Sequence, residues 1–164
     1  MTFEQYQQEA VKFRTESANN EEYLTLGLIE EVGEAAGKLA KRRRDGVFDE
    51  KAFIKELGDI LWFVANLADY YDRINDTSFT LELKYCFERR AADINFPEWS
   101  IMRIACYVGN AVGEQDINFR VIVSEVARLA LYFDYTLERV AEINLAKLRD
   151  RQVRGVICGN GDER

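Results

Sequence analysis

Two short stretches, Glu31-Val32-Gly33-Glu34 and Glu56-Leu57-Gly58-Asp59, decide how this chain is interpreted. Each places two carboxylates three residues apart within an apolar stretch of helical period. Side chains three residues apart lie on the same face of an α-helix. Four carboxylates that converge repel one another unless a cation lies between them. The two stretches therefore predict two helices that share a cation site.

The link between the two stretches predicts a helical hairpin. Asp45-Gly46 is a signal that ends the first helix, and Asp49 can cap the second. The short link from Lys41 to Asp49 favours an antiparallel pair that brings both acidic motifs to the same height. Gly33 and Gly58 lie inside the predicted helices, where each costs about 1 kcal/mol relative to alanine. We expect close helix approach, or room for a ligand beside the acids, to offset that cost.

Helical periodicity extends along the chain and predicts an all-α helical bundle. The expected helices cover residues 2–17, 21–44, 49–73, 79–93, 98–113, 117–134 and 136–151. The glycine-containing tail, 154–164, is expected to be irregular. The length of 164 residues suits one domain spanning 1–164.

The second half of the chain contains a possible internal repeat of the first. Residues 67–72, Leu-Ala-Asp-Tyr-Tyr-Asp, resemble residues 129–134, and residues 32–35 resemble residues 108–111. In this alignment Tyr107 and Asn110 stand where Glu31 and Glu34 stand in the first copy. Residues 76–135 are therefore either an insertion or a duplicated segment that has lost its acids.

Composition excludes several classes of function. The formal charge of −7 argues against a general binder of nucleic acid or membrane surfaces. The chain has no histidine, which removes histidine-based catalysis and histidine metal ligation. Its three cysteines are far apart, so we expect reduced thiols and no zinc site. No signal-peptide pattern begins the sequence and no apolar run is long enough to span a bilayer, so a cytoplasmic protein is expected.

The predicted cluster contains oxygen ligands and neither nitrogen nor sulfur, a set that selects Mg²⁺ or Mn²⁺. We expect Glu31, Glu34, Glu56 and Asp59 to bind the metal. Glu30 lies about 100° around the helix from Glu31 and can orient a water molecule. The apolar faces carry no matching number of basic residues, and buried acids need a partner.

The sequence around these acids resembles that of a known family. Glu31-x-x-Glu34, a gap of 21 residues, and Glu56-x-x-Asp59 resemble the motif of the all-α nucleoside triphosphate pyrophosphohydrolases. Within that superfamily the chain is most similar to MazG-like proteins, over residues 1–75 and about 136–164. The resemblance implies Mg²⁺-dependent cleavage of a nucleoside triphosphate to a monophosphate and pyrophosphate, with water attacking the α-phosphorus. The related dimeric dUTPases combine a catalytic half with a degenerate one, so dUTP or another pyrimidine nucleotide is a possible substrate.

Further residues are candidates for substrate binding. Asn144, Lys147, Arg151 and Arg154 recur on one face of the last helix, although cations there also suit the helix dipole. The other candidates are Lys55 beside the second motif, Trp62 and Asn66 for the base, and Asp162 and Arg164 in the tail. For Trp62 core packing is the competing role. Residues 41–44, Lys-Arg-Arg-Arg, are interpreted as a solvated helix end.

Two other classes of function stay open at this point. One is a helical module that binds a nucleotide or a partner without turnover. The other is a structural assembly protein whose acids merely cover the surface. We also expect a homo-oligomer, a dimer or tetramer, because an acidic two-helix hairpin needs further helices to bury its apolar faces.

Overall fold

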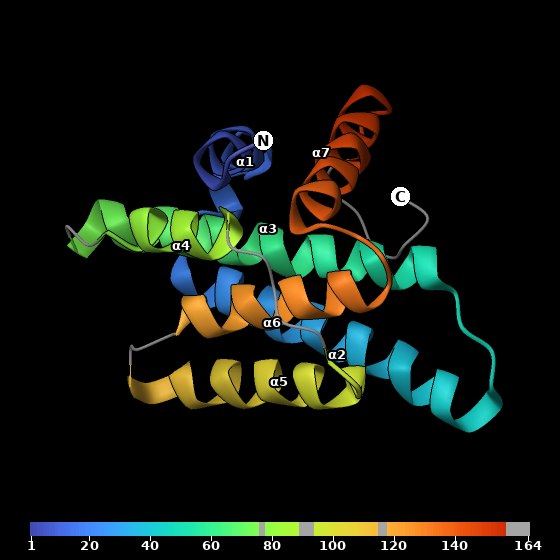
Figure 1. Ribbon diagram of the computed structural model, residues 1–164. Coiled ribbons are helices and arrows are strands. Elements are labelled where there is room, and N and C mark those ends of the chain that lie inside the picture. The colour runs from blue at the N-terminus through green and yellow to red at the C-terminus, as the bar shows by residue number, and fades with distance from the viewer. Residues whose placement is uncertain (76–77, 89–93, 115–117, 157–164) are drawn as a thin grey trace.

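The described residues fold into seven α-helices and two short 3-10 helices, without a strand among them, which confirms the predicted all-α fold. The computed structural model describes residues 1–75, 78–88, 94–114 and 118–156 (Figure 1). The helices are α1 (Phe3–Ala10), α2 (Glu21–Asp45), α3 (Glu50–Asn75), α4 (Phe79–Glu88), α5 (Pro97–Glu114), α6 (Phe119–Tyr132) and α7 (Leu137–Val153). Within the described ranges, none of these helices has the length and hydropathy needed to cross a membrane.

The link between the two central helices follows the predicted signals, and a side-chain cap also marks the start of the first of them. The Asn20 side chain accepts a hydrogen bond from the Tyr23 backbone N–H at 2.8 Å and caps α2. Gly46 ends that helix in the left-handed conformation, with φ of 71°, which glycine adopts without strain. Asp49 accepts from the Ala52 N–H at 2.9 Å at the start of α3. Two side-chain caps and a left-handed glycine therefore define the ends of the helices in the hairpin that carries both acidic motifs.

The first helix is shorter than the predicted range of 2–17. It ends at Ala10 and continues as two 3-10 turns, Val11–Phe13 and Glu16–Ala18. Between them Arg14 is extended, and its guanidinium donates to the Asn66 carbonyl at 3.1 Å and pairs with Asp69 at 2.6 Å. These tertiary contacts favour a break that helical periodicity does not reveal. The predicted helix 79–93 is described only as far as Glu88, and residues 89–93 lie outside the described part.

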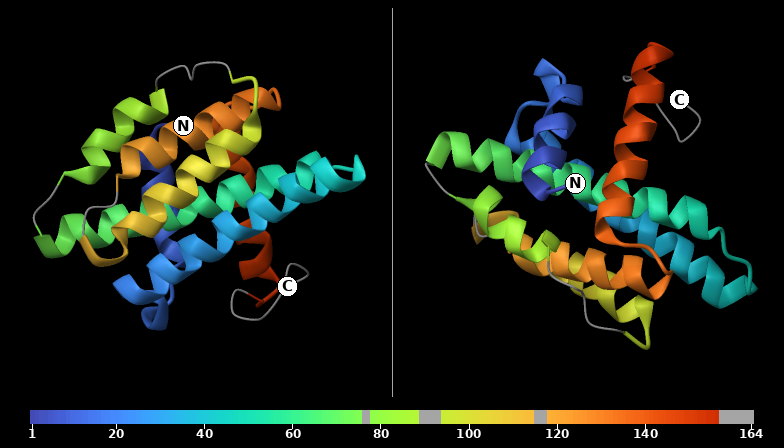
Figure 2. Two further views of the ribbon diagram at one scale, coloured as in Figure 1. Left: turned by 90° about the horizontal axis from the view of Figure 1, so that it is seen from below. Right: turned by 45° about the horizontal axis from the view of Figure 1, so that its top comes forward.

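Four helices form a bundle in which α2 contacts α3 and α5, while α6 contacts the same two helices. α2 and α5 lie side by side and run in opposite directions (Figures 1 and 2). α3 is the most central element, since fifteen of its 26 residues are buried. Each fully buried aliphatic side chain there contributes about 1.5–3 kcal/mol relative to an exposed one.

Two helices from opposite ends of the sequence complete the surroundings of α3. α1 and α7 both contact α3 and each other, and both stand across its length (Figure 2). α7 approaches closely at Gly58, where a Cβ would lie 2.9 Å from the Cβ of Asn144. Close approach therefore explains this glycine, as the sequence predicted. It also places the last helix directly beside the second acidic motif.

The basic run at the end of α2 is only partly a solvated helix end. Lys41, Arg43 and Arg44 are exposed as predicted. Arg42 instead lies over the rings of three aromatic residues, at 5.1–5.7 Å from the ring centroids: Phe48, Tyr132 and Phe133. These cation–π contacts join the C-terminal ends of α2 and α6. The sequence does not show that these aromatic residues meet.

Burial in α6 repeats that in α3 at a constant spacing of 62 residues. Leu57, Val64 and Leu67 are buried in α3, and Phe119, Val126 and Leu129 are buried in α6. The two hairpins, α2–α3 and α5–α6, also pack together as halves of one bundle. This pattern favours the duplicated-segment interpretation of residues 76–135 over a simple insertion, and the repeat itself stays a prediction.

Candidate metal and phosphate site

Three of the four predicted metal ligands meet between α2 and α3. Oxygen atoms of Glu31, Glu56 and Asp59 all lie within 4.8 Å of one another. Glu31 is half-buried on α2, whereas Glu56 and Asp59 are buried on α3, with residue exposures of 3% and 8%. The antiparallel hairpin thus brings the two motifs to the same height, as expected. Buried carboxylates at this separation repel unless cations offset their charge.

Two lysines supply positive charge to the cluster. The Nζ of Lys38 lies 2.9 Å from Oε1 of Glu56, and Lys147 pairs with Oδ2 of Asp59. Lys38 belongs to α2 and lies one turn beyond Glu34, so it faces the same side of the helix. The cluster thus has two lysines for three acids, so the basic residues still do not match the acids in number. Sequence spacing could have identified Lys38.

A buried series of hydrogen bonds holds the other carboxylate oxygen of Asp59, the one that does not contact Lys147. Nδ2 of Asn144 donates to Oδ1 of Asp59 at 2.9 Å, and the hydroxyl of Tyr6 donates to Oδ1 of Asn144 at 2.9 Å. Tyr6 is fully buried and Asn144 is 1% exposed. The tyrosine hydroxyl therefore fixes the amide so that its NH₂ group faces the acid. Tyr6 precedes Asn144 by 138 residues, and no pattern in the sequence links them.

The cluster also changes the proton affinity of its members. Burial, followed by the charges of Asp59 and Glu56, raises the pKa of Glu31 from 4.5 to about 9. Burial raises the pKa of Glu56 as well, although Lys38 opposes this shift. Burial is the main reason why the pKa of Tyr6 lies well above 10, with Asp59 adding to it.

These donor atoms fit a hard divalent cation. All three come from carboxylates, and nitrogen and sulfur ligands are absent from this cluster. Mg²⁺ and Mn²⁺ favour such oxygen sets, and Mg²⁺ is usually held by only a few carboxylates together with water and substrate phosphates. Burial is the main cause of the raised pKa of Glu31, and the carboxylate charges of Asp59 and Glu56, which a cation between them would offset, add to it.

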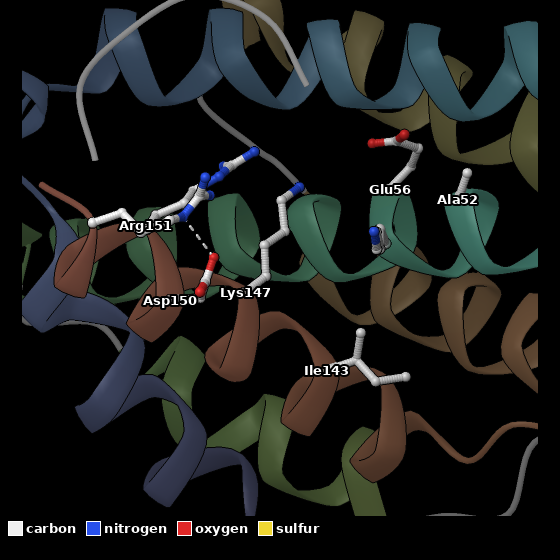
Figure 3. A pocket seen from close by; sticks show the side chains of 8 residues that line it. Ala52, Glu56, Ile143, Lys147, Asp150 and Arg151 are labelled. Atoms are coloured by element: carbon white, nitrogen blue, oxygen red, sulfur yellow. Dashed lines mark ion pairs between the residues drawn. The ribbon is translucent and has the colours of Figure 1, made fainter. Parts of the chain in front are cut away.

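A cationic pocket adjoins the acids. Its volume is about 340 Å³, and Glu56 belongs to both the pocket wall and the acidic cluster. Figure 3 shows the pocket between α3 and α7, with the Lys147 and Arg151 side chains extending beside the helix that carries Glu56. Its lining residues are Ala52, Lys55, Glu56, Ile143, Lys147, Asp150, Arg151 and Arg154. Four of these eight are basic, which favours an anionic ligand.

Some predicted site residues make other contacts. Glu30 and Glu34 are exposed on α2, and Glu34 is near enough to raise the pKa of Glu31 slightly further. Trp62 is half-buried, donates to the Ala10 carbonyl at 3.1 Å and packs edge-on against Phe63. These contacts match the core-packing alternative for this residue.

Asn66 is fully buried and donates to the Trp62 carbonyl at 2.8 Å, while its Oδ1 has no hydrogen-bond partner among the described residues. Neither Trp62 nor Asn66 lines the pocket. Asp162 and Arg164 lie outside the described residues. Substrate binding by these four residues stays a prediction.

Comparison with known proteins supports the resemblance over the acidic hairpin. Residues 19–84 match the MazG nucleotide pyrophosphohydrolase domain, which confirms the predicted similarity to MazG-like proteins over that segment. The matched segment contains both acidic motifs and ends within α4. The Gene 37 protein of Mycobacterium phage L5 is 44% identical over 55 residues, covering 30% of this chain and 48% of that protein. The chain thus spans about half the length of this relative. No solved structure matches the chain.

Proposed function

We propose that this protein is a metal-dependent nucleotide pyrophosphohydrolase that cleaves a nucleoside or deoxynucleoside triphosphate to the monophosphate and pyrophosphate. One observation carries the proposal: the carboxylate cluster and the cationic pocket share Glu56. A metal–triphosphate complex needs both kinds of surface side by side. The match of residues 19–84 to the MazG domain supports the same reaction class.

In this proposal, Glu31, Glu56 and Asp59 hold Mg²⁺ or Mn²⁺, with the exposed Glu34 as a fourth ligand and Glu30 as a water-orienting base. A metal held there would supply a Lewis acid that polarises phosphoryl oxygens and activates water for attack at the α-phosphorus. Asn144 keeps the Asp59 carboxylate oriented through its 2.9 Å hydrogen bond.

The pocket residues act on the rest of the triphosphate. Lys55, Lys147 and the two arginines, Arg151 and Arg154, neutralise the phosphate oxygens and stabilise the charge that develops on the departing pyrophosphate. Arg154 also pairs with Asp150 at 2.9 Å, and both residues line the pocket. These residues explain how the charge of the substrate is recognised. They do not explain a preference for one base.

The proposal is tested by a pyrophosphate-release screen with Mg²⁺ or Mn²⁺ across all NTPs and dNTPs, dUTP and oxidised nucleotides. The wild-type protein should release pyrophosphate and monophosphate in equal amounts from at least one of them. Glu56→Gln should lower turnover by at least about 100-fold, because it removes a carboxylate common to the cluster and the pocket.

The matched control is Glu50→Gln, which changes an exposed acid in the first turn of the same helix and should leave turnover unchanged. Circular dichroism should show equal helicity in all three proteins. Binding of a nucleotide without pyrophosphate release would instead support the non-catalytic module, and an active Glu56→Gln variant would remove the site assignment.

A further inference from the structure

Lys38 contacts the acidic cluster, but the proposed reaction gives it no task. Its Nζ lies 2.9 Å from Oε1 of Glu56, and the side chain of Glu56 is only 4% exposed. The side chain of Lys38 is 24% exposed, so this ion pair lies at the edge of the helix interface rather than in open solvent. Charges that are partly removed from water are screened less than surface charges. The ion pair therefore acts on Glu56 when this carboxylate meets any other cation.

The sequence places Lys38 on the acidic face of α2. Lys38 follows Glu34 by four residues and Glu31 by seven, so the three side chains recur on one side of the helix. Helical side chains lean toward the N-terminus, which turns the long Lys38 side chain back over the turn that carries Glu34. Since α3 runs back along α2 in the opposite direction, residues that follow Glu31 on α2 lie beside residues that precede Asp59 on α3 (Figure 1). This geometry explains why the ammonium group meets Glu56.

The two lysines of the cluster differ in what else they contact. Lys147 lies on α7 and lines the cationic pocket, where a phosphate group can draw it away from Asp59. Lys38 is not among the described residues that line this pocket, although its partner Glu56 is. Phosphate binding therefore does not explain Lys38, whose ammonium group faces the carboxylates.

An ammonium group and a divalent cation compete for the same carboxylate. Both bind an oxygen of Glu56, and two positive charges within a few ångströms of each other repel strongly where little water separates them. A metal ion on one carboxylate oxygen would still lie close to an ammonium group on the other. Binding of a metal ion to Glu56 thus favours withdrawal of Lys38 toward solvent, which its flexible side chain and partial exposure allow.

We infer that Lys38 is a built-in competitor of the metal: it stabilises Glu56 in the metal-free protein and lowers the affinity of the cluster for a free divalent cation. The inference rests on the proposed metal site. It adds a residue that sets the metal concentration at which this site fills. Substrate phosphates bring further oxygen ligands to Mg²⁺, so the competition affects the free ion more than the metal–nucleotide complex.

Titration of the full chain with Mn²⁺ in the absence of nucleotide tests this inference, with free Mn²⁺ measured by electron paramagnetic resonance. Lys38→Met removes the charge and keeps an unbranched side chain, so the dissociation constant for Mn²⁺ should fall at least about tenfold. Lys38→Arg retains the charge and should bind Mn²⁺ as weakly as the wild type does. The matched control is Lys41→Met, which removes an exposed charge from the last turns of the same helix and should leave the dissociation constant unchanged.

Thermal unfolding in the presence of a chelator gives a second measurement. Lys38→Met should melt at least about 3 °C below the wild type, because Glu56 stays buried without this partner. Saturating Mn²⁺ should then raise the melting temperature of Lys38→Met by more than that of the wild type. If Lys38→Met does not fold without metal, Lys38→Gln, which keeps a polar side chain at this position, takes its place in both measurements.

The outcomes separate this inference from the proposed reaction. An unchanged or higher dissociation constant in the uncharged variants would show that Lys38 supports the metal ligands or only the fold. That result would overturn the inference and leave the reaction intact. A wild-type protein that binds no Mn²⁺ would overturn the inference together with the metal site, and the pyrophosphate-release screen then tests the reaction separately.

Discussion

The hydroxyl of Tyr6 determines which end of the Asn144 amide faces Asp59. Without this donor the amide can rotate and present its oxygen to the carboxylate. We expect Tyr6→Phe to lower kcat for pyrophosphate release about tenfold or more, since residues that orient metal ligands have effects of this size. It should also cost about 1 kcal/mol of unfolding free energy for the lost hydrogen bond.

Steady-state kinetics and urea unfolding measure these two effects separately. Tyr85→Phe is the matched control, because it removes the hydroxyl of an exposed tyrosine far from the acids in sequence. If Tyr6→Phe loses stability but keeps its kcat, the hydrogen bond is structural only.

The raised pKa of Glu31 predicts how stability depends on pH without metal. The unfolded chain binds this proton with a pKa near 4.5 and the folded protein with a pKa of about 9. The stabilisation by the protonated form is therefore full below about pH 4.5 and is lost as pH rises through about 9. In Glu31→Gln this contribution is removed, so its melting temperature should fall less than that of the wild type between pH 5 and pH 9.

Thermal unfolding in the presence of a chelator measures this difference. Glu22→Gln, which changes an exposed acid on the same helix, should follow the wild-type curve. Parallel pH profiles for wild type and Glu31→Gln would contradict the assignment of the raised pKa to this residue.

At the residue scale, sequence spacing predicted the acidic residues but not the residues that hold them in place. Glu31, Glu56 and Asp59 could be placed together because periodicity and a short link define a hairpin. Tyr6 could not be placed there, since its partner lies 138 residues away. A contact of that range depends on how α1 and α7 cross α3, and periodicity carries no information about such crossings.

At the scale of elements, Gly58 sets the distance between α3 and α7. A methyl group there would lie 2.9 Å from the Asn144 Cβ, so Gly58→Ala should push the helices apart and cost about 1–3 kcal/mol of unfolding free energy. Urea unfolding of Gly58→Ala, Asn144→Gly and the double variant measures the contact. In the Asn144→Gly background the Gly58→Ala change should cost much less, because the opposing Cβ is absent. Additive costs would show that this contact does not limit the helix separation.

The bounds of the long helices were predictable for a local reason. Asn20, Gly46 and Asp49 act through the backbone within one turn, so their effect is readable in sequence. The first helix was predicted too long because Arg14 leaves it to contact α3. Tertiary hydrogen bonds there override a continuous helical period.

At the scale of the molecule, α3 is the element on which most of the others pack. It contacts α1, α2, α4, α6 and α7, whereas α4 buries only Leu83 and Phe87 in its described side chains. Amide exchange followed by mass spectrometry should therefore be slowest at 57–68, with opening free energies that approach global unfolding. α4 should exchange faster through local opening. Equal protection of α3 and α4 would contradict this hierarchy.

Lys147 belongs to two surfaces at once: it pairs with Asp59 and it lines the cationic pocket. One ammonium group cannot neutralise a carboxylate and a phosphate fully at the same time. A divalent cation that takes over Asp59 therefore frees Lys147 for an anion, and an anion that draws Lys147 away opens Asp59 to a cation. By thermodynamic reciprocity, each ligand should then raise the affinity for the other by the same factor. We expect the protein to bind the metal–nucleotide chelate more tightly than either component alone.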